Sequence, residues 1–184
     1  MNSFEPTPVR DMTNVPYDPE WPVHFAKISR ILKSALGEEC IAIEHVGSTA
    51  VPGLSAKPKI DMDVVIDSMS HFSAVSRLLE GLGYYPQGDL GRTDREAFGR
   101  QDDRVPFDGV GTVQPKHNLY VCTKESSYLR EHLAFRDYLR VHPEAALAYS
   151  ALKNGLAERD RYDQEAYVAG KTEFIRGILV KAGA

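Results

Sequence analysis

The segment 60–66, Ile-Asp-Met-Asp-Val-Val-Ile, constrains the fold more than any other part of the chain. Its apolar residues predict an interior strand that is buried on both faces. Successive side chains of a strand point to opposite faces, so Asp61 and Asp63 share one face, with Cα atoms about 6.5–7 Å apart. Two ionised carboxylates at that spacing repel each other, and a divalent cation is the usual solution. The alternative is a solvated face of an edge strand, which the apolar neighbours disfavour.

A second polar segment lies just before this strand. Gly47-Ser48 directly follows a predicted strand at residues 40–46, and a glycine followed by a small hydroxyl residue lets backbone N–H groups approach a phosphate closely. Pro52 is predicted to begin a short helix whose N-terminus also favours an anion. Phosphate donors and paired acids on adjacent strands can meet at one substrate.

Hydrophobic periodicity and turn residues predict a small mixed sheet followed by a helical C-terminal third. The predicted strands cover residues 40–46, 60–66, a segment that starts at Tyr84, 95–100 and 116–122. The predicted helices cover residues 19–36, 71–82 and the region 125–181, in which Pro143 opens one helix and Asp163 caps the last. Residues 1–16 contain three prolines and are expected to form an extended arm. We expect residues 1–184 to form a single domain.

Composition narrows the class of protein. The chain has 184 residues, of which 42% are hydrophobic and 26% charged, as in a globular domain. No apolar run is long enough to span a membrane, and the N-terminus lacks the pattern of a signal peptide. Cys40 and Cys122 lie in apolar segments and are expected to be reduced in a cytoplasmic protein. A net charge of −4 argues against a strong nucleic-acid footprint, but not against a local phosphate site.

Several common motifs are absent from the sequence. The spacing of Gly47 and Gly53 does not form a Walker A loop, because Leu54-Ser55 stands where Gly-Lys is needed. The pair Gly109 and Gly111 lacks the third glycine of a dinucleotide fingerprint. Two cysteines and six scattered histidines give no zinc spacing.

The combination of Gly47-Ser48, a short spacer and Asp61-Met62-Asp63 resembles the signature of the nucleotidyltransferase superfamily that includes DNA polymerase beta. More narrowly, the chain resembles the GrpB family in the stretches 17–21, 45–54, 57–64, 117–121 and 135–140. The resemblance implies an α/β (α+β) fold with a mixed sheet backed by helices and a C-terminal helical part. It also implies that Asp61 and Asp63 hold Mg²⁺ or Mn²⁺ and that Gly47 and Ser48 hold the phosphates of a nucleoside triphosphate. Related domains are fused to dephospho-CoA kinases, and the group has been labelled a protein-folding accessory domain.

The resemblance is incomplete at one position. Active members of the superfamily carry a third acid on a later strand, and the corresponding segment here, residues 116–122, contains none. His117, Asn118 or Tyr120 stands in its place. His117 is a candidate metal ligand or general base, since imidazole changes charge near neutral pH. The alternative is a histidine hydrogen-bonded to the backbone or to a neighbour.

Basic residues supply the remaining site candidates. Lys57 and Lys59 either neutralise triphosphate charge or are solvated lysines of a turn. Arg136 and Lys171 lie on otherwise apolar helix stripes, where a basic side chain either extends past the stripe or points into a cleft. If they point into a cleft, they form a phosphate-facing wall.

The function predicted from the sequence is metal-dependent transfer of a nucleoside monophosphate to a hydroxyl on a small molecule, a protein or RNA. The alternative is an accessory module that binds nucleotide without turnover. The paired acids favour the enzyme, and the missing third acid favours the module. The oligomeric state does not follow from the sequence.

Overall fold

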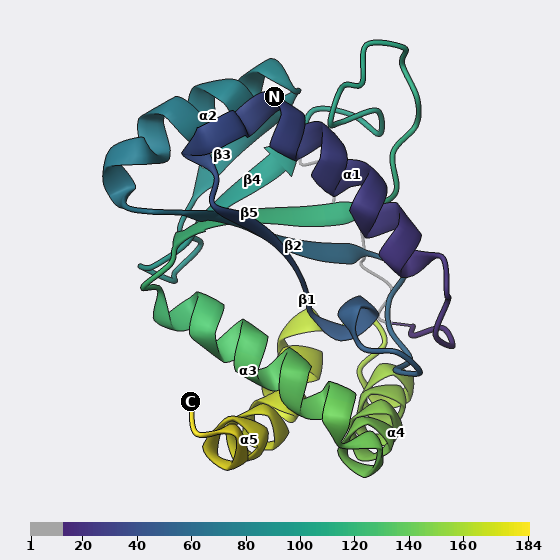
Figure 1. The fold of residues 1–184 in the computed structure, drawn as a ribbon. Helices are drawn as coiled ribbons and strands as arrows, with labels where there is room; N and C mark the ends of the chain where they lie inside the picture. Colours follow the sequence, from purple (N-terminus) through teal and green to yellow (C-terminus); the bar gives the residue numbers. More distant parts are fainter. Residues whose placement is uncertain (1–12) are drawn as a thin grey trace, which may run out of the picture.

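The computed structural model describes residues 13–184, so most of the expected N-terminal arm lies outside the described residues. Five strands form one sheet, with helices on both of its faces (Figure 1). The strands are β1 (Ala42–Val46), β2 (Ile60–Ile66), β3 (Tyr84–Gly88), β4 (Glu96–Arg100) and β5 (His117–Thr123). The helices are α1 (Trp21–Leu36), α2 (Phe72–Gly81), α3 (Ser127–Val141), α4 (Pro143–Arg159) and α5 (Gln164–Ala182). The mixed sheet and the C-terminal helices confirm the predicted α/β architecture.

The sheet has the strand order β1-β2-β5-β4-β3, so β2 is an interior strand as predicted. β2 and β5 run parallel, and the other three pairs are antiparallel. Because β2 has a neighbour on each side, its residues face fixed partners. Asp63 lies opposite Glu44 on β1 and Tyr120 on β5, while Asp61 lies opposite Asn118 on β5.

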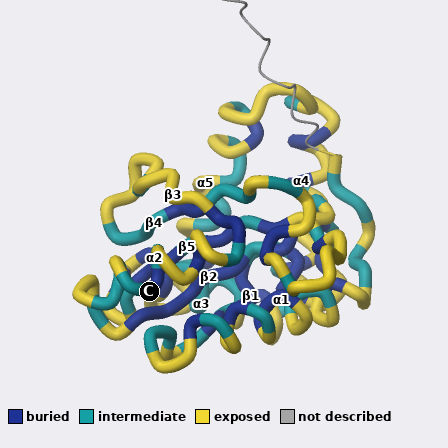
Figure 2. The backbone as a smooth tube through the Cα atoms, turned by 90° about the horizontal axis from the view of Figure 1, so that it is seen from above, coloured by how far each residue is buried: buried dark blue, intermediate teal, exposed yellow. Residues whose placement is uncertain are grey.

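The two faces of the sheet differ in what covers them. α1 and α2 lie on one face, and α3, α4 and α5 lie on the other (Figure 1). Ile60, Met62 and Val64 of β2 pack into the main apolar core with residues of α1 and α2. The alternation of the strand therefore turns Asp61 and Asp63 toward the C-terminal helices. Figure 2 shows that these central strands are largely buried.

Local signals set most of the helix boundaries. α1 begins at Trp21 with Pro22 in its first turn, where the missing N–H of proline costs no hydrogen bond. Pro143 opens α4, and the Asp163 side chain caps α5 by accepting from the backbone N–H of Ala166 at 3.0 Å. Both features were predicted. No helix of residues 13–184 is long and apolar enough to cross a membrane.

Candidate functional site

Each of the two acids of β2 has one oxygen held by a neighbouring side chain. Asn118 Nδ2 donates to Asp61 Oδ1 at 2.6 Å, and His132 Nδ1 on α3 lies 2.9 Å from Asp63 Oδ2. Asp63 is fully buried, and its second oxygen, Oδ1, has no hydrogen-bond partner within residues 13–184. A buried carboxylate oxygen without a donor is costly unless a cation binds it. Asp61 is half-buried, and burial raises the pKa of its carboxyl group.

Gly47 makes room for Asp61. Its backbone has φ 71° and ψ −169°, which is a conformation essentially reserved for glycine. A Cβ atom at this position would lie 2.5 Å from Asp61 Oδ2. The glycine therefore brings the turn after β1 against the carboxylate. The short helix predicted at Pro52 does not form; a 3₁₀ turn at Ser48–Ala50 precedes that proline instead, because the chain turns directly after Gly47.

Three lysines from three different segments gather beside Ser48. We call Lys57, Lys153 and Lys171 the lysine cluster. Lys153 on α4 is 2% exposed and donates from Nζ to Ser48 Oγ at 2.9 Å and to the Ser55 carbonyl. Lys57 Nζ and Lys171 Nζ each lie 4.5 Å from the centroid of the Tyr167 ring. The loop before β2, α4 and α5 thus bring three cations to one place.

Two members of the lysine cluster, Lys153 and Lys171, form no ion pair within residues 13–184. Burial, with the charges of Lys171 and Lys57, lowers the pKa of Lys153 to about 7. Burial and the charge of Lys57 lower the pKa of Lys171 to about 8, while the Asp61 carboxylate acts in the opposite direction. A buried lysine without an ion-pair partner in the described range, such as Lys153, is typical of an anion-binding site.

Lys153 was missed by sequence reasoning, although a signal was present. On α4, Tyr149, Lys153 and Leu156 are all buried and stand at helical spacing. This is the same pattern of a lysine on an apolar stripe that identified Lys171 on α5. His132 was not among the predicted site residues, because its contact with Asp63 depends on how α3 packs on the sheet.

His117 is not brought to the acids. It is buried on the opposite face of the sheet, where Nε2 lies 2.7 Å from Tyr84 Oη and Nδ1 lies 2.8 Å from the Pro115 carbonyl oxygen. Burial lowers its pKa to about 4. The expectation that His117 acts as a ligand or base is therefore corrected: it is a core histidine, and the neighbour of Asp61 on β5 is Asn118.

Arg136 uses its hydrogen-bond donors in contacts within the protein. Its Nη1 donates to Glu44 Oε2 at 2.7 Å and to the His45 carbonyl at 3.0 Å, and its Nε donates to Asp137 Oδ1 at 2.7 Å. These bonds tie α3 to β1, so the predicted phosphate contact of Arg136 is replaced by a structural one. Lys59 is exposed just before β2, and its charge partly offsets the rise in the pKa of Asp61 that burial causes.

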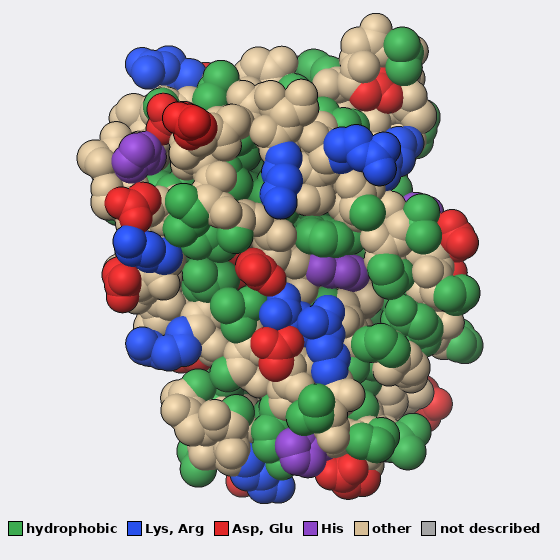
Figure 3. Space-filling view, in the orientation of Figure 1, with side chains coloured by type: hydrophobic (Ala, Val, Ile, Leu, Met, Phe, Trp, Pro, Cys, Tyr) green, Lys and Arg blue, Asp and Glu red, His purple; other side chains and the backbone are tan. Residues whose placement is uncertain are grey.

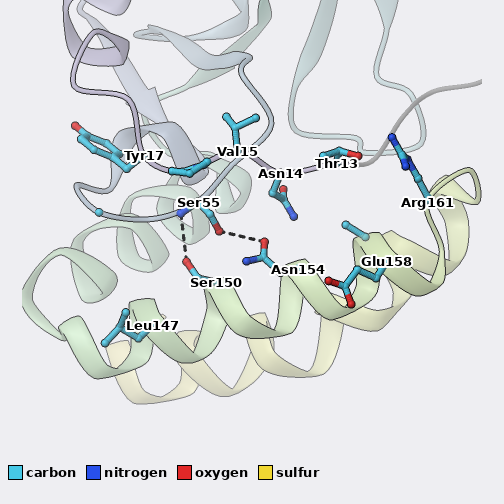
Figure 4. Close-up of a pocket in the computed structure, with 13 residues that line it drawn as sticks. Thr13, Asn14, Val15, Tyr17, Ser55, Leu147, Ser150, Asn154, Glu158 and Arg161 are labelled. Carbon is cyan, nitrogen blue, oxygen red and sulfur yellow. Dashed lines mark hydrogen bonds between the residues drawn. The ribbon is translucent and has the colours of Figure 1, made fainter.

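A cavity of about 770 Å³ lies between residues 13–17, the loop at 53–55 and α4 (Figure 4). At its base Ser55 N–H donates to Ser150 Oγ at 3.2 Å, and Ser55 Oγ donates to Asn154 Oδ1 at 3.3 Å. The Ser55 carbonyl accepts from Lys153. These contacts fix the loop on α4 and so position Lys153 beside Ser48.

The donor set at the acids fits a divalent cation held partly by a ligand. Asp61 and Asp63 supply carboxylate oxygens, which Mg²⁺ and Mn²⁺ prefer, and Asp63 Oδ1 is left without a protein partner among the residues described. Within the same range no group of three or more His, Cys, Asp or Glu side chains converges to form a complete metal site. A cation held by two carboxylates takes the rest of its coordination shell from water and substrate phosphate. Asn118 and His132 are the outer groups that would orient these carboxylates.

Residues 12–181 match the GrpB protein family. The chain belongs to the GrpB family. It is 39% identical over 91% of its length to the UPF0157 protein PA4798 of Pseudomonas aeruginosa, and 32% identical over 96% of its length to the UPF0157 protein YqkA of Bacillus subtilis. The chain spans 66% and 48% of these two relatives. A dephospho-CoA kinase of Mycobacterium bovis is 35% identical over 85% of the chain, which covers 42% of that kinase.

Solved structures show the fold class. The crystal structure of the conserved protein GrpB from Enterococcus faecalis is 30% identical, covers 92% of this chain and 96% of its own, and has a TM-score of 0.77. The structure of the Cid1 poly(U) polymerase H336N mutant bound to MgATP is 11% identical in sequence, with a TM-score of 0.58. The match covers 84% of this chain and 50% of the polymerase chain. The GrpB chain therefore has a nucleotidyltransferase-like fold, as the Gly-Ser and Asp-x-Asp segments predicted.

Proposed function

We propose that this GrpB domain binds a nucleoside triphosphate together with Mg²⁺ or Mn²⁺ at the face shared by Asp61 and Asp63, and transfers the nucleoside monophosphate to a hydroxyl acceptor. One observation carries the proposal. Asp63 has a carboxylate oxygen with no partner within residues 13–184, and on the same sheet face Lys153, which forms no ion pair in that range, contacts Ser48. One metal–triphosphate complex would partner the Asp63 carboxylate and the lysines together, because it presents a cation to the acids and an anion to the lysines.

The residues divide the work of transfer between them. Ser48 and the lysine cluster bind the β- and γ-phosphates, while Gly47 keeps the turn close to Asp61. The acceptor oxygen attacks the α-phosphorus and forms a new P–O bond. The bond from that phosphorus to the bridging oxygen breaks, pyrophosphate leaves, and the hydroxyl proton passes to water. Lys153 and Lys171 stabilise the charge that develops on pyrophosphate. A bound metal ion supplies further neutralisation of the phosphate charge.

Nucleotide binding is tested first, with a matched pair of lysines on α5. Lys171→Met removes one member of the lysine cluster, and Lys181→Met removes an exposed lysine near the end of the same helix. Calorimetry with ATP and Mn²⁺ is expected to show a loss of affinity of about tenfold for Lys171→Met, the value of one charge-assisted contact, and none for Lys181→Met. Equal affinities for the two variants would contradict the assignment.

Nucleotidyl transfer is tested by comparing variants of Asp63, on β2, and of Asp67, just beyond the end of that strand. Each radiolabelled nucleoside triphosphate is incubated with the protein, Mg²⁺ or Mn²⁺, and pools of small molecules, protein or RNA. Labelled product should form with the wild type and with Asp67→Asn, because Asp67 is an exposed partner of Lys124 beyond the end of β2. No labelled product should form with Asp63→Asn.

The competing function is a GrpB module that binds nucleotide without turnover or serves as an accessory domain. The observation that favours it is the amide of Asn118, where an acid on β5 would complete a second metal site. Nucleotide binding that depends on Lys171, with no labelled product from any acceptor pool, would favour this module over the enzyme.

A further inference from the structure

A second group of aromatic and charged side chains flanks the acids, on the side away from the lysine cluster. The lysine cluster adjoins Ser48, which follows β1, whereas Tyr120 lies on β5 at the other side of β2. Tyr120 is directly opposite Asp63 in the sheet register and shares its face. Tyr128 on α3 packs edge-on against Tyr120, with ring centroids 5.8 Å apart. The acids therefore lie between a cationic flank and an aromatic one.

Arg95 is held against the two tyrosine rings. Its guanidinium carbon lies 4.3 Å from the Tyr120 ring centroid and 4.9 Å from that of Tyr128, and Nη1 donates to Tyr128 Oη at 3.3 Å. Its Nε is buried and has no hydrogen-bond partner within residues 13–184, and no carboxylate of that range forms an ion pair with it. A stacked guanidinium presents its N–H edge to a ligand, in a geometry that suits the two oxygens of a phosphate.

Asp94, one of the two acids adjacent to Arg95 in the sequence, is held by other groups. The Asp94 carboxylate caps α3 by accepting from Ser127 Oγ at 2.5 Å and from the backbone N–H of Tyr128 at 3.0 Å. These bonds lower the pKa of Asp94 to about 2. The cap fixes the start of α3 and, with it, Tyr128 under the guanidinium. Arg95 is therefore positioned by its neighbours while its charge stays available.

The space beside Arg95 is small and bordered by acids. A cavity of about 230 Å³ is lined by Arg95 together with Asp94, Glu96 and Thr123. Glu131 on α3 is nearby, because it pairs with Arg92, whose guanidinium carbon is 5.0 Å from the Tyr128 ring centroid. These carboxylates repel a polyanion more strongly than a single phosphate group, because the repulsion sums over the phosphates of the chain. The flank thus favours a small ligand over RNA.

We propose that Arg95, Tyr120 and Tyr128 form the acceptor subsite, and that the acceptor is a small phosphorylated alcohol whose phosphate monoester binds Arg95. This inference rests on the proposed nucleotidyl transfer. In-line displacement needs the attacking and leaving oxygens on opposite sides of the α-phosphorus. The lysine cluster holds the leaving pyrophosphate next to Ser48, at the Asp61 end of the pair. The acceptor therefore enters from the β5 side of Asp63, where Tyr120 and Arg95 lie.

The binding step is tested by the side-chain Nε–Hε resonance of Arg95, observed by NMR in the full chain and assigned by its loss in Arg95→Lys. Titration with glycerol 3-phosphate should shift this resonance saturably, and glycerol should not. The resonance of Arg77, exposed on α2 across the sheet, serves as the control and should stay in place. Because the lysine cluster also attracts phosphate, the Arg95 resonance is the readout that separates the two subsites.

The affinity for glycerol 3-phosphate should fall about tenfold or more in Arg95→Lys, which keeps the charge but loses the paired donors. An unmoved Arg95 resonance, an equal shift with glycerol, or a shift produced only by an RNA oligonucleotide ending in a 3′-hydroxyl would overturn the inference. Failure of the nucleotidyl-transfer proposal has a different signature, namely equal affinity of wild type and Lys171→Met for ATP with Mn²⁺. The Arg95 readout needs no nucleotide and so stands apart from that result.

Discussion

Replacing Gly47 with alanine perturbs the site through a single added methyl group. The wild-type backbone conformation at Gly47, φ 71° and ψ −169°, disfavours any side chain, and the new Cβ would lie 2.5 Å from Asp61 Oδ2. The backbone term costs about 1–3 kcal/mol. Moving Asp61 aside also breaks its 2.6 Å bond from Asn118, which adds about 1 kcal/mol. We therefore expect Gly47→Ala to lower the free energy of unfolding by about 2–4 kcal/mol.

Gly53 provides the matched control for this substitution. It also has a positive φ, 78°, but a Cβ at this position would meet nothing within 4 Å. Gly53→Ala should therefore lose only the backbone term, measured by urea denaturation of both variants. In an Asp61→Ala background the excess cost of Gly47→Ala over Gly53→Ala should disappear, because the clashing carboxylate is gone. Equal losses for the two glycines, or an excess that persists without Asp61, would refute this reasoning.

Three further predictions concern charge at the site. The pKa of Lys153, about 7, lies below its ordinary value of 10.5, so between these two values the unfolded chain holds a proton that the folded chain has released. The free energy of unfolding should therefore rise with pH across that window. In urea titrations at pH 7, 8 and 9 the rise should be smaller for Lys153→Met than for the wild type. Asn118→Asp places a third carboxylate beside Asp61, so calorimetry should show tighter Mn²⁺ binding in the absence of nucleotide. Repulsion between the carboxylates should also make the metal-free protein less stable at low salt. Unchanged Mn²⁺ affinity would argue against a metal at this position. Arg136→Gln leaves Glu44 without its 2.7 Å partner and should cost about 1–3 kcal/mol in urea denaturation without changing the affinity for ATP with Mn²⁺; a loss of nucleotide affinity at unchanged stability would reinstate a phosphate contact for Arg136.

Alternation along the strands was enough to predict much of this site. The period of two in residues 60–66 placed Asp61 and Asp63 on one face, and the interior position of β2 followed from its apolar residues. The same period of two also indicates that His117 faces the apolar core. His117 is in phase with Leu119 and Val121, which are core residues, and out of phase with Asn118 and Tyr120.

Contacts between distant segments account for what the sequence did not predict. Arg136 contacts Glu44, and Lys153 contacts Ser48, across 92 and 105 residues respectively. Such pairs depend on which face of each C-terminal helix packs on the sheet, and helical periodicity gives the apolar stripe without its partner. A lysine within a stripe is therefore recognisable from sequence, but its anionic or hydroxyl partner is not.

Acidic and basic side chains are interspersed on the face of the molecule drawn in Figure 3. The net charge of −4 agrees with this pattern. In the proposed function, attraction of nucleotide phosphate depends on the short-range charge of the lysine cluster rather than on the field of the whole protein.

The most direct test of the central claim is a crystal structure with Mn²⁺ and a non-hydrolysable nucleoside triphosphate, with the metal located by its anomalous scattering. We expect a manganese peak in contact with carboxylate oxygens of Asp61 and Asp63, including Asp63 Oδ1. The triphosphate should contact Ser48 and the lysine cluster. Manganese or triphosphate bound at any other place, or no binding at saturating concentration, would contradict the claim that these residues form one nucleotide site.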